Sequence, residues 1–211
     1  MNKKLYIVGI KGQGMTALAI VLQAHGYLVS GSDVADTFST DAVLHEHGIV
    51  VHKGFDPTNV PQNAETVVYS TAYTPEHPEL VRARELNIPI ATYPEMLGQL
   101  FADMDGIAVA GSHGKTTTTA LLGVILTEAK MDPTVIVGSP IPAFKGNARV
   151  GKSQILVVET DEYQNKFTKY TPHHLVVTNI DWDHPDFFPT PQEYEMVFQA
   201  FMHKIPVDGI L

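Results

Sequence analysis

Short, unbroken runs of apolar residues recur along this sequence, and helical patterns separate them. Apolar and polar residues do not alternate within the runs, which is typical of parallel strands covered on both faces. The runs lie at residues 5–10, 67–69, 107–110, 155–158 and 175–177, and helices are expected at 15–25, 78–86, 94–101 and 117–130. Strands that alternate with helices predict an α/β fold with a mostly parallel sheet.

The predicted elements fall into two groups. A polar segment that contains a glycine, residues 102–106, follows a predicted helix and precedes the strand at 107–110. We place a domain boundary there, with a Rossmann-like parallel-sheet domain over residues 1–103 and a second α/β domain over 104–211. The sequence ends in a turn that leads toward a strand, so we expect the second domain to be truncated.

Composition argues against several classes of protein. The formal net charge is −9, which argues against general affinity for nucleic acids or anionic membranes. There is no cysteine, so disulfide frameworks and thiol chemistry are excluded. Too few apolar residues precede Lys11 to form a signal peptide or a membrane span, so we expect a cytoplasmic protein.

The first candidate site is a glycine-rich turn after the first predicted strand. Gly12-Gln13-Gly14-Met15-Thr16-Ala17 fits the G-x-G-x-x-[GA] pattern at the mouth of a helix, and Asp33 ends the next apolar stretch. The glycines allow close approach to a pyrophosphate, and the acid can accept a hydrogen bond from a ribose hydroxyl. The motif fits NAD and UDP-sugars equally, and a tight turn without a ligand stays an alternative.

The second candidate site is the loop Gly111-Ser112-His113-Gly114-Lys115-Thr116, which ends as a P-loop does. Its N–H groups would surround phosphate, Lys115 would reach the outer phosphates, and the Thr116 hydroxyl would bind Mg²⁺. The usual first glycine is replaced by Val109, so the loop is a shortened variant. The alternative is a glycine turn with an incidental lysine.

These motifs resemble the Mur ligase family, the ATP-dependent ligases that build the peptide of the peptidoglycan precursor. The resemblance runs over essentially the whole chain and includes the short ATP loop, residues 111–118. It also includes Gly31-Ser32-Asp33, Ser70-Thr71-Ala72 and Pro94-Glu95-Met96-Leu97. Lys11 and Gln13 depart from it, because small residues are usual there. The resemblance implies that residues 104–211 are part of a central P-loop ATP-binding domain.

The resemblance also implies ligands for the two candidate sites. ATP and Mg²⁺ would bind the second domain, and UDP-N-acetylmuramate would bind the first. The residues expected to bind the UDP-sugar are Gly12, Gln13, Gly14, Met15, Asp33, Ser70 and Thr71. The residues expected to bind ATP are Gly111, Ser112, His113, Gly114, Lys115, Thr116 and Thr117.

Two more side chains follow predicted strands and are expected beside the phosphate loop. Glu159 and His184 would lie at the carboxyl edge of the sheet and complete a metal shell with Thr116. His184 is unusual for Mg²⁺, which prefers oxygen, so the family resemblance implies its role. Lys115, Glu159 and His184 are the expected catalytic residues. Most neighbouring acids are expected to be solvated loop charges: Asp161, Glu162, Asp181 and Asp183.

The leading functional prediction is an amide-forming ligase of peptidoglycan precursor synthesis. ATP would phosphorylate the carboxylate of UDP-N-acetylmuramate, and L-alanine would attack the acyl phosphate. A murein-recycling ligase that joins a tripeptide is the close alternative, and residues 161–163 and 183–186 lean toward it. Two further alternatives are an NAD-dependent dehydrogenase and a non-catalytic nucleotide-binding fragment. The dehydrogenase would leave the lysine loop unexplained, whereas the nucleotide-binding fragment would account for it. We expect these 211 residues alone to bind but not to ligate.

Overall fold

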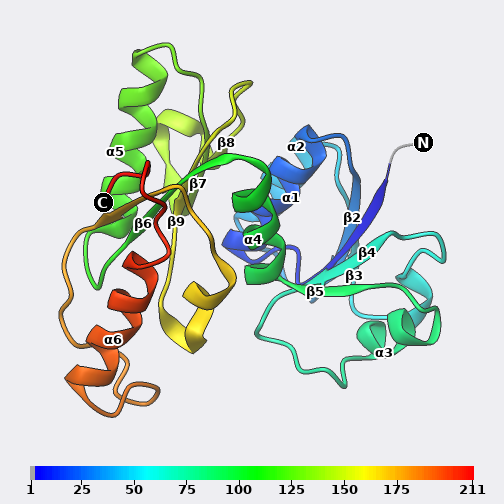
Figure 1. Ribbon diagram of the computed structural model, residues 1–211. Coiled ribbons are helices and arrows are strands. Elements are labelled where there is room, and N and C mark those ends of the chain that lie inside the picture. The colour runs from blue at the N-terminus through cyan, green and yellow to red at the C-terminus, as the bar shows by residue number, and fades with distance from the viewer. Residues whose placement is uncertain (1–2) are drawn as a thin grey trace. The chain divides into compact units, whose positions relative to one another are not determined.

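The computed structural model describes residues 3–211, which form two compact units (Figure 1). The first unit ends at Met96 and the second begins at Leu97. This division falls inside helix α4, Tyr93–Asp103. Among the described residues, no helix is long and apolar enough to span a membrane.

The first unit contains a five-stranded parallel sheet in the order β3-β2-β1-β4-β5. Its strands are β1 Lys4–Val8, β2 Leu28–Asp33, β3 Val50–Lys53, β4 Thr66–Tyr69 and β5 Ile90–Thr92. Helices α1 Gln13–Ala24, α2 Thr40–Glu46 and α3 Pro78–Glu85 connect them, with a 3₁₀ turn η1 at Pro57–Asn59. The central strand β1 is almost entirely buried, as its unbroken apolar run predicts.

Strand register in the first unit brings three loops to one edge. Val8 pairs with Ser32 of β2 and with Tyr69 of β4, so all three strands end together. The chain order reverses direction at β1, because β2 and β4 lie on its opposite sides. Ligands of open parallel sheets bind at such a point, outside the carboxyl ends of the strands.

The second unit contains a mixed sheet in the order β10-β6-β9-β7-β8. Its strands are β6 Asp105–Ala110, β7 Thr134–Ile141, β8 Gly146–Arg149, β9 Ile155–Glu159 and β10 His174–Val177. Helices α5 Lys115–Glu128 and α6 Pro191–Met202, and 3₁₀ turns η2 Pro142–Phe144 and η3 Tyr163–Lys169, complete it. Only β8, at the sheet edge, runs antiparallel to its neighbour.

The predicted α/β fold class is confirmed, and every predicted apolar run overlaps a strand. Strands β3, β5, β7 and β8 and helices α2 and α6 were not predicted. Strand β8 has the sequence Gly-Asn-Ala-Arg, which carries no apolar run because an edge strand is held mainly by backbone pairing. Helix α5 begins at Lys115, two residues before the expected start.

Candidate functional site

The first candidate site lies at the carboxyl edge of the first sheet. Helix α1 begins at Gln13, and its N-cap residue, Gly12, offers no side chain to the first N–H groups. Such a helix start favours an anion. A cavity of about 400 Å³ opens beside it. Its lining comprises Gly9, Lys11, Gly12, Gln13, Asp33, Val34, Phe38, Ser39, Ser70, Ala72 and Tyr73.

Four of the predicted UDP-sugar residues line this cavity, namely Gly12, Gln13, Asp33 and Ser70. The other three lie elsewhere in the same turn region. A Cβ atom on Gly14 would meet the Tyr93 ring at 3.2 Å, Met15 is buried, and Thr71 is exposed next to Ser70. Gly14 therefore provides room for an aromatic ring of its own unit, and its direct contact with a pyrophosphate stays a prediction.

Asp33 organises the glycine turn through both carboxylate oxygens. Its Oδ2 accepts from the Lys11 N–H at 2.7 Å, and its Oδ1 accepts from the Val34 N–H at 2.8 Å. Tyr73 lies across the cavity, and burial, assisted by the Asp33 charge, raises the pKa of its hydroxyl. A ribose hydroxyl would share Asp33 with these two backbone donors, since a carboxylate can accept several hydrogen bonds.

The candidate phosphate loop connects β6 to α5 in the second unit. Gly111 has φ +135° and Gly114 has φ +80°, conformations that L side chains rarely adopt. A Cβ on Gly111 would lie 2.1 Å from Thr178 Oγ1, so only glycine fits against the segment after β10. Asn179 fixes the loop from the same segment, because its Oδ1 accepts from the His113 N–H at 3.0 Å.

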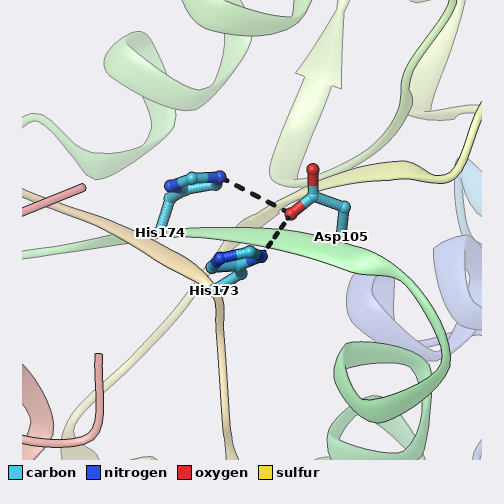
Figure 2. Close-up of side chains that lie close together, drawn as sticks. All are labelled: Asp105, His173 and His174. Carbon is cyan, nitrogen blue, oxygen red and sulfur yellow. Dashed lines mark ion pairs between the residues drawn. The ribbon is translucent and has the colours of Figure 1, made fainter. Parts of the chain in front are cut away.

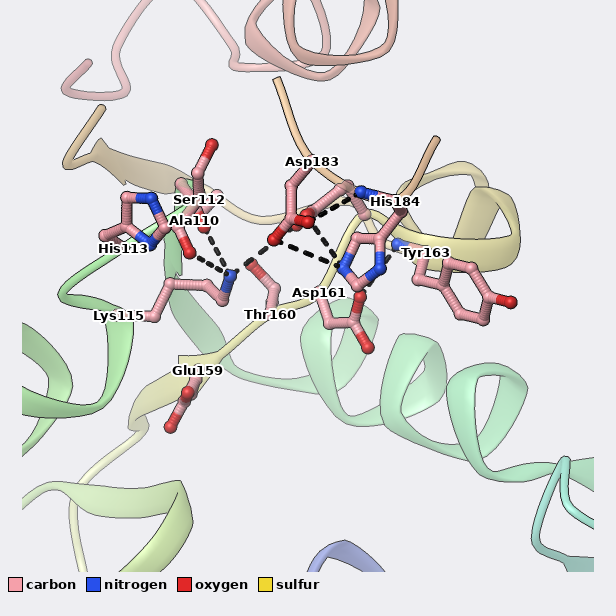
Figure 3. Close-up of polar contacts among 12 residues, drawn as sticks. Ala110, Ser112, His113, Lys115, Glu159, Thr160, Asp161, Tyr163, Asp183 and His184 are labelled. Carbon is pink, nitrogen blue, oxygen red and sulfur yellow. Dashed lines mark hydrogen bonds and ion pairs between the residues drawn. The ribbon is translucent and has the colours of Figure 1, made fainter. Parts of the chain in front are cut away.

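Lys115 is the first residue of α5, and its side chain folds back over the loop. Its Nζ donates to the carbonyl oxygen of Ser112 (Figure 3). It also donates to the Gly111 carbonyl oxygen and lies 3.7 Å from Glu162 Oε2. Only 1% of the Glu162 side chain is exposed. Its Oε1 accepts from the Tyr194 hydroxyl at 2.9 Å, whereas its Oε2 has no hydrogen-bond donor among the described residues.

Glu159, at the end of β9, is held on the other side of the loop. Its Oε1 accepts from the Thr116 hydroxyl at 2.7 Å, and its Oε2 accepts from the Gly138 N–H at 2.6 Å. The four consecutive threonines thus serve different purposes. Thr116 faces Glu159, whereas the buried Thr119 donates to the Lys115 carbonyl within the helix.

His184 lies with other acids rather than with Glu159. Its Nε2 is 3.7 Å from Glu162 Oε1 and 3.9 Å from Asp183 Oδ2. Figure 3 shows the Glu159 side chain and the His184 ring on different sides of the cluster. The three expected metal ligands therefore form two groups in this structure, Thr116 with Glu159 and His184 with Glu162.

Glu162 was misjudged from sequence. We expected a solvated loop charge, but the side chain is buried beside Lys115. Tyr194 was missed altogether, although its hydroxyl contacts both Glu162 and Ser112 Oγ, the latter at 2.8 Å. Burial raises the pKa of Tyr194, with the Glu162 charge as a further cause, so the hydroxyl remains a donor. No local pattern marks either residue, because their partners come from separate segments.

A second cluster lies at the opposite edge of the same sheet, where Asp105 begins β6 (Figure 2). Its Oδ1 is 3.1 Å from His173 Nδ1 and 3.5 Å from His174 Nε2. The two imidazole rings are stacked at an angle of 4°, so their lone pairs do not converge on one point. His174 Nδ1 also accepts from the Ile210 N–H, which places the ring proton on the nitrogen that faces Asp105. This arrangement suits imidazole–carboxylate pairing better than a metal ion.

Comparisons with known proteins address the identity of the chain. Residues 4–105 match the Mur ligase family, catalytic domain, and residues 109–211 match the Mur ligase middle domain. The chain belongs to the Mur ligase family. The resemblance found in the sequence is confirmed, and both glycine loops lie inside the matched ranges.

Curated relatives of this Mur ligase chain are named UDP-N-acetylmuramate–L-alanine ligase. The protein from Desulfitobacterium hafniense is 46% identical over 99% of this chain and 46% of its own length. The protein from Borreliella burgdorferi is 42% identical over 98% of the chain and 45% of its own length. The chain therefore spans about half the length of the curated relatives it matches.

Two solved structures resemble this Mur ligase chain closely. One is UDP-N-acetylmuramate:L-alanyl-gamma-D-glutamyl-meso-diaminopimelate ligase from Neisseria meningitides, with a TM-score of 0.89 and 28% identity, covering 100% of this chain and 71% of that one. The other is UDP-N-acetylmuramate–alanine ligase from Thermotoga maritima, with a TM-score of 0.84 and 29% identity, covering 98% and 48%.

Proposed function

We propose that this chain supplies the UDP-sugar and ATP sites of a ligase that joins L-alanine to the carboxylate of UDP-N-acetylmuramate. One observation carries the proposal. Lys115 and Thr116 begin a helix at the carboxyl edge of a parallel sheet, with Glu159 bonded to the threonine hydroxyl. The names of relatives at 40–46% identity support the substrate assignment. Because both substrates are cytoplasmic metabolites, the proposal includes a cytoplasmic location.

The proposed reaction has two steps. A carboxylate oxygen of the lactyl group attacks the γ-phosphorus of ATP, which gives an acyl phosphate and ADP. The L-alanine nitrogen then attacks the acyl carbon, the carbon–oxygen bond to phosphate breaks, and the nitrogen loses a proton. The products are an amide and inorganic phosphate.

In this reaction the chain must mainly stabilise negative charge on the phosphate oxygens. Lys115 would turn its ammonium from the loop carbonyls toward the outer phosphates, and the N–H groups of residues 114–116, at the start of α5, would donate to the others. Glu162 and Tyr194 would hold Lys115 near the loop before ATP arrives. Aligning the reacting groups in this way can lower a barrier by several kcal/mol.

The chain offers a suitable place for a magnesium ion. Thr116 Oγ1 and Glu159 Oε1 are oxygen donors 2.7 Å apart, and Mg²⁺ prefers oxygen ligands. A magnesium ion there would neutralise triphosphate charge. His184 would act in its own group with Glu162, whose carboxylate lies 3.7 Å both from His184 Nε2 and from Lys115 Nζ.

A second candidate is the murein-recycling ligase, which joins a tripeptide to the same UDP-sugar. The likeness to the Neisseria meningitides enzyme, at a TM-score of 0.89, favours keeping it. Sequence identity favours L-alanine, since the curated relatives at 46% and 42% carry that name. Both candidates use the same UDP-sugar and ATP, so they share the sites proposed above.

Calorimetric titration of the chain with UDP-N-acetylmuramate tests the proposal directly. Gly12→Ala is the informative variant, because a Cβ there meets its neighbours only at 3.5 Å or more and the unliganded fold accepts it. The methyl group would project at the start of α1 and obstruct a pyrophosphate. Gly146→Ala is the matched control, since that position has open space in the other unit. Equal affinity in all three proteins would exclude the glycine turn as the UDP-sugar site.

A second titration, with ATP and Mg²⁺, tests whether the chain has both binding sites of a ligase or binds only the UDP-sugar. We expect the chain to bind both ligands independently, and to release no phosphate when L-alanine is added. Sustained amide formation by the purified chain would show that the catalytic site is smaller than proposed.

A further inference from the structure

Lys11 is the residue of the first glycine turn that the proposed function leaves without a role. Small residues are usual at this position in the family, yet here a lysine lies almost completely buried, with 2% of its side chain exposed. Its Nζ donates to Val34 O at 3.0 Å and Asp36 O at 2.7 Å, and pairs with Asp41 Oδ1 at 3.1 Å. An ammonium has three protons, and these three acceptors use all of them.

The backbone of Lys11 contacts the same part of the chain. Its N–H donates to Asp33 Oδ2, and its carbonyl accepts from the Thr40 hydroxyl, both at 2.7 Å. Gln13, the other departure from the family pattern, reaches Ser39 Oγ at 3.4 Å. The unusual residues of the turn therefore converge on residues 34–41, which we call the wall segment: the connection between β2 and α2 together with the first two residues of α2.

The wall segment forms one side of the UDP-sugar cavity. Val34, Phe38 and Ser39 line the cavity, and the Lys11 ammonium lies 5.7 Å from the centre of the Phe38 ring. Although partial burial acts in the opposite direction, the Phe38 N–H and the Lys11 ammonium hold the pKa of Asp41 below its usual range. Asp41 is therefore ionised at neutral pH and available to pair with Lys11.

We propose that Lys11 is a positioning residue that holds the wall segment in place before the UDP-sugar binds. It does not bind phosphate itself, because its protons are engaged and its side chain is buried. Val34 to Ser39 contains no helix or strand, so without this anchor the segment would have to be ordered during binding. Ordering of that kind reduces affinity. The proposal rests on UDP-sugar binding by this unit.

Lys11→Met is the test, since methionine keeps the length and apolar volume of the stem. We expect UDP-N-acetylmuramate to bind about tenfold more weakly, because the segment must then be ordered on binding. In the ligand-free protein, amide hydrogen exchange should accelerate in residues 34–41 and stay unchanged in β1 and β4. Lys53→Met is the matched control, because Lys53 is exposed on β3 near Asp41 but outside the anchor.

Asp41→Asn separates positioning from direct phosphate binding. If Lys11 anchors the wall, Asp41→Asn weakens binding, and the double variant is little worse than Lys11→Met alone. If Lys11 were a phosphate ligand, removing its carboxylate partner would strengthen binding instead, and this result would overturn the proposal. Wild-type exchange in residues 34–41 of Lys11→Met would overturn it as well.

Two further outcomes remain interpretable. If Lys11→Met does not fold, Asp41→Asn and Thr40→Val test the same anchor with smaller changes. If the wild-type chain does not bind UDP-N-acetylmuramate, the proposed function fails, whereas hydrogen exchange in the ligand-free protein still decides whether Lys11 orders the wall segment.

Discussion

Replacing Lys115 by methionine should destabilise the second unit as well as remove a phosphate contact. The reason is Glu162, whose side chain is 1% exposed and whose Oε2 lies 3.7 Å from Lys115 Nζ. That oxygen has no hydrogen-bond donor among the described residues. Once Lys115 is gone, a buried carboxylate loses its nearest full positive charge, which is costly in a protein interior.

The distance sets the scale of this effect. Two unit charges 3.7 Å apart attract by about 4 kcal/mol at an effective dielectric constant near 20. Solvent reduces this, because 18% of the Lys115 side chain is exposed, and the Tyr194 hydroxyl still donates to Glu162 in the variant. We therefore expect a loss of about 2 kcal/mol, which is below the ~3–5 kcal/mol of fully buried pairs and within the ~1–3 kcal/mol of a buried polar group left unsatisfied.

Urea unfolding followed by the fluorescence of Trp182 measures this loss. Trp182 is the only tryptophan of the chain and lies in the second unit, so its signal reports on that unit. A loss of about 2 kcal/mol would lower the unfolding midpoint by about 1 M urea. Lys130→Met is the control. That lysine also pairs with a glutamate, Glu128, but the pair is 4.0 Å apart and 84% of the lysine side chain is exposed.

A double variant decides whether Glu162 is the cause. Glu162→Gln keeps an oxygen for the Tyr194 hydroxyl but removes the charge, so Lys115→Met should cost much less in its presence. We expect a coupling energy of at least about 1 kcal/mol. Additive losses, or a Lys115→Met midpoint equal to that of Lys130→Met, would refute the buried-pair reasoning.

Three further predictions follow from named contacts. Gly111→Ala should lower the urea midpoint far more than Gly114→Ala. A Cβ at position 111 would lie 2.1 Å from Thr178 Oγ1, whereas a Cβ at position 114 would point into open space. Equal urea midpoints for the two variants would contradict the close contact at Gly111. Thr116→Val should abolish the increase in ATP affinity on adding Mg²⁺ and leave metal-free ATP binding unchanged. Quenching of Trp182 fluorescence by ATP, with and without a chelator, measures both affinities. If Mg²⁺ still increases the ATP affinity of the variant, Thr116 is not a ligand of the cation. Burial lowers the pKa of His77, so the unfolded chain takes up its proton first, and stability is lost as pH falls below about 6.5. In His77→Asn the amide oxygen can replace the ring Nδ1 that accepts from the Glu79 N–H at the helix start. This variant should lose less stability in that window by circular dichroism, and identical pH profiles would count against this.

Much of the fold could be predicted because parallel strands leave a simple pattern. Strands β1, β4, β6 and β9 are continuous apolar runs, since they lie inside their sheets and are mostly buried. Strand β10 also contains an apolar run, although it lies at a sheet edge and its Val176 is exposed. Edge strands β3 and β8 carry no such run, because they are half exposed and rest on backbone pairing. Helix α6 had a usable signal, Thr190 as N-cap before Pro191, which we did not use.

The candidate sites were predictable only where one segment supplies the chemistry. Both glycine turns lie where the sequence places them, because strand, turn and helix start are adjacent in the chain. The burial of Glu162 was not predictable, since it depends on Lys115, His184 and Tyr194 from three distant segments. The wall segment was likewise hidden, because a lysine in a glycine turn does not reveal which acceptors it will reach.

Competition calorimetry on the unmodified chain tests the central claim most directly. The chain is titrated with UDP-N-acetylmuramate, first alone and then after saturation with UDP, with NADH or with ATP and Mg²⁺. The proposed sites predict one molecule bound per chain, displaced by UDP and unaffected by NADH or by ATP. Binding that NADH displaces, or no binding of UDP-N-acetylmuramate at any concentration tested, would contradict the assignment of the first unit as the UDP-sugar site of a Mur ligase.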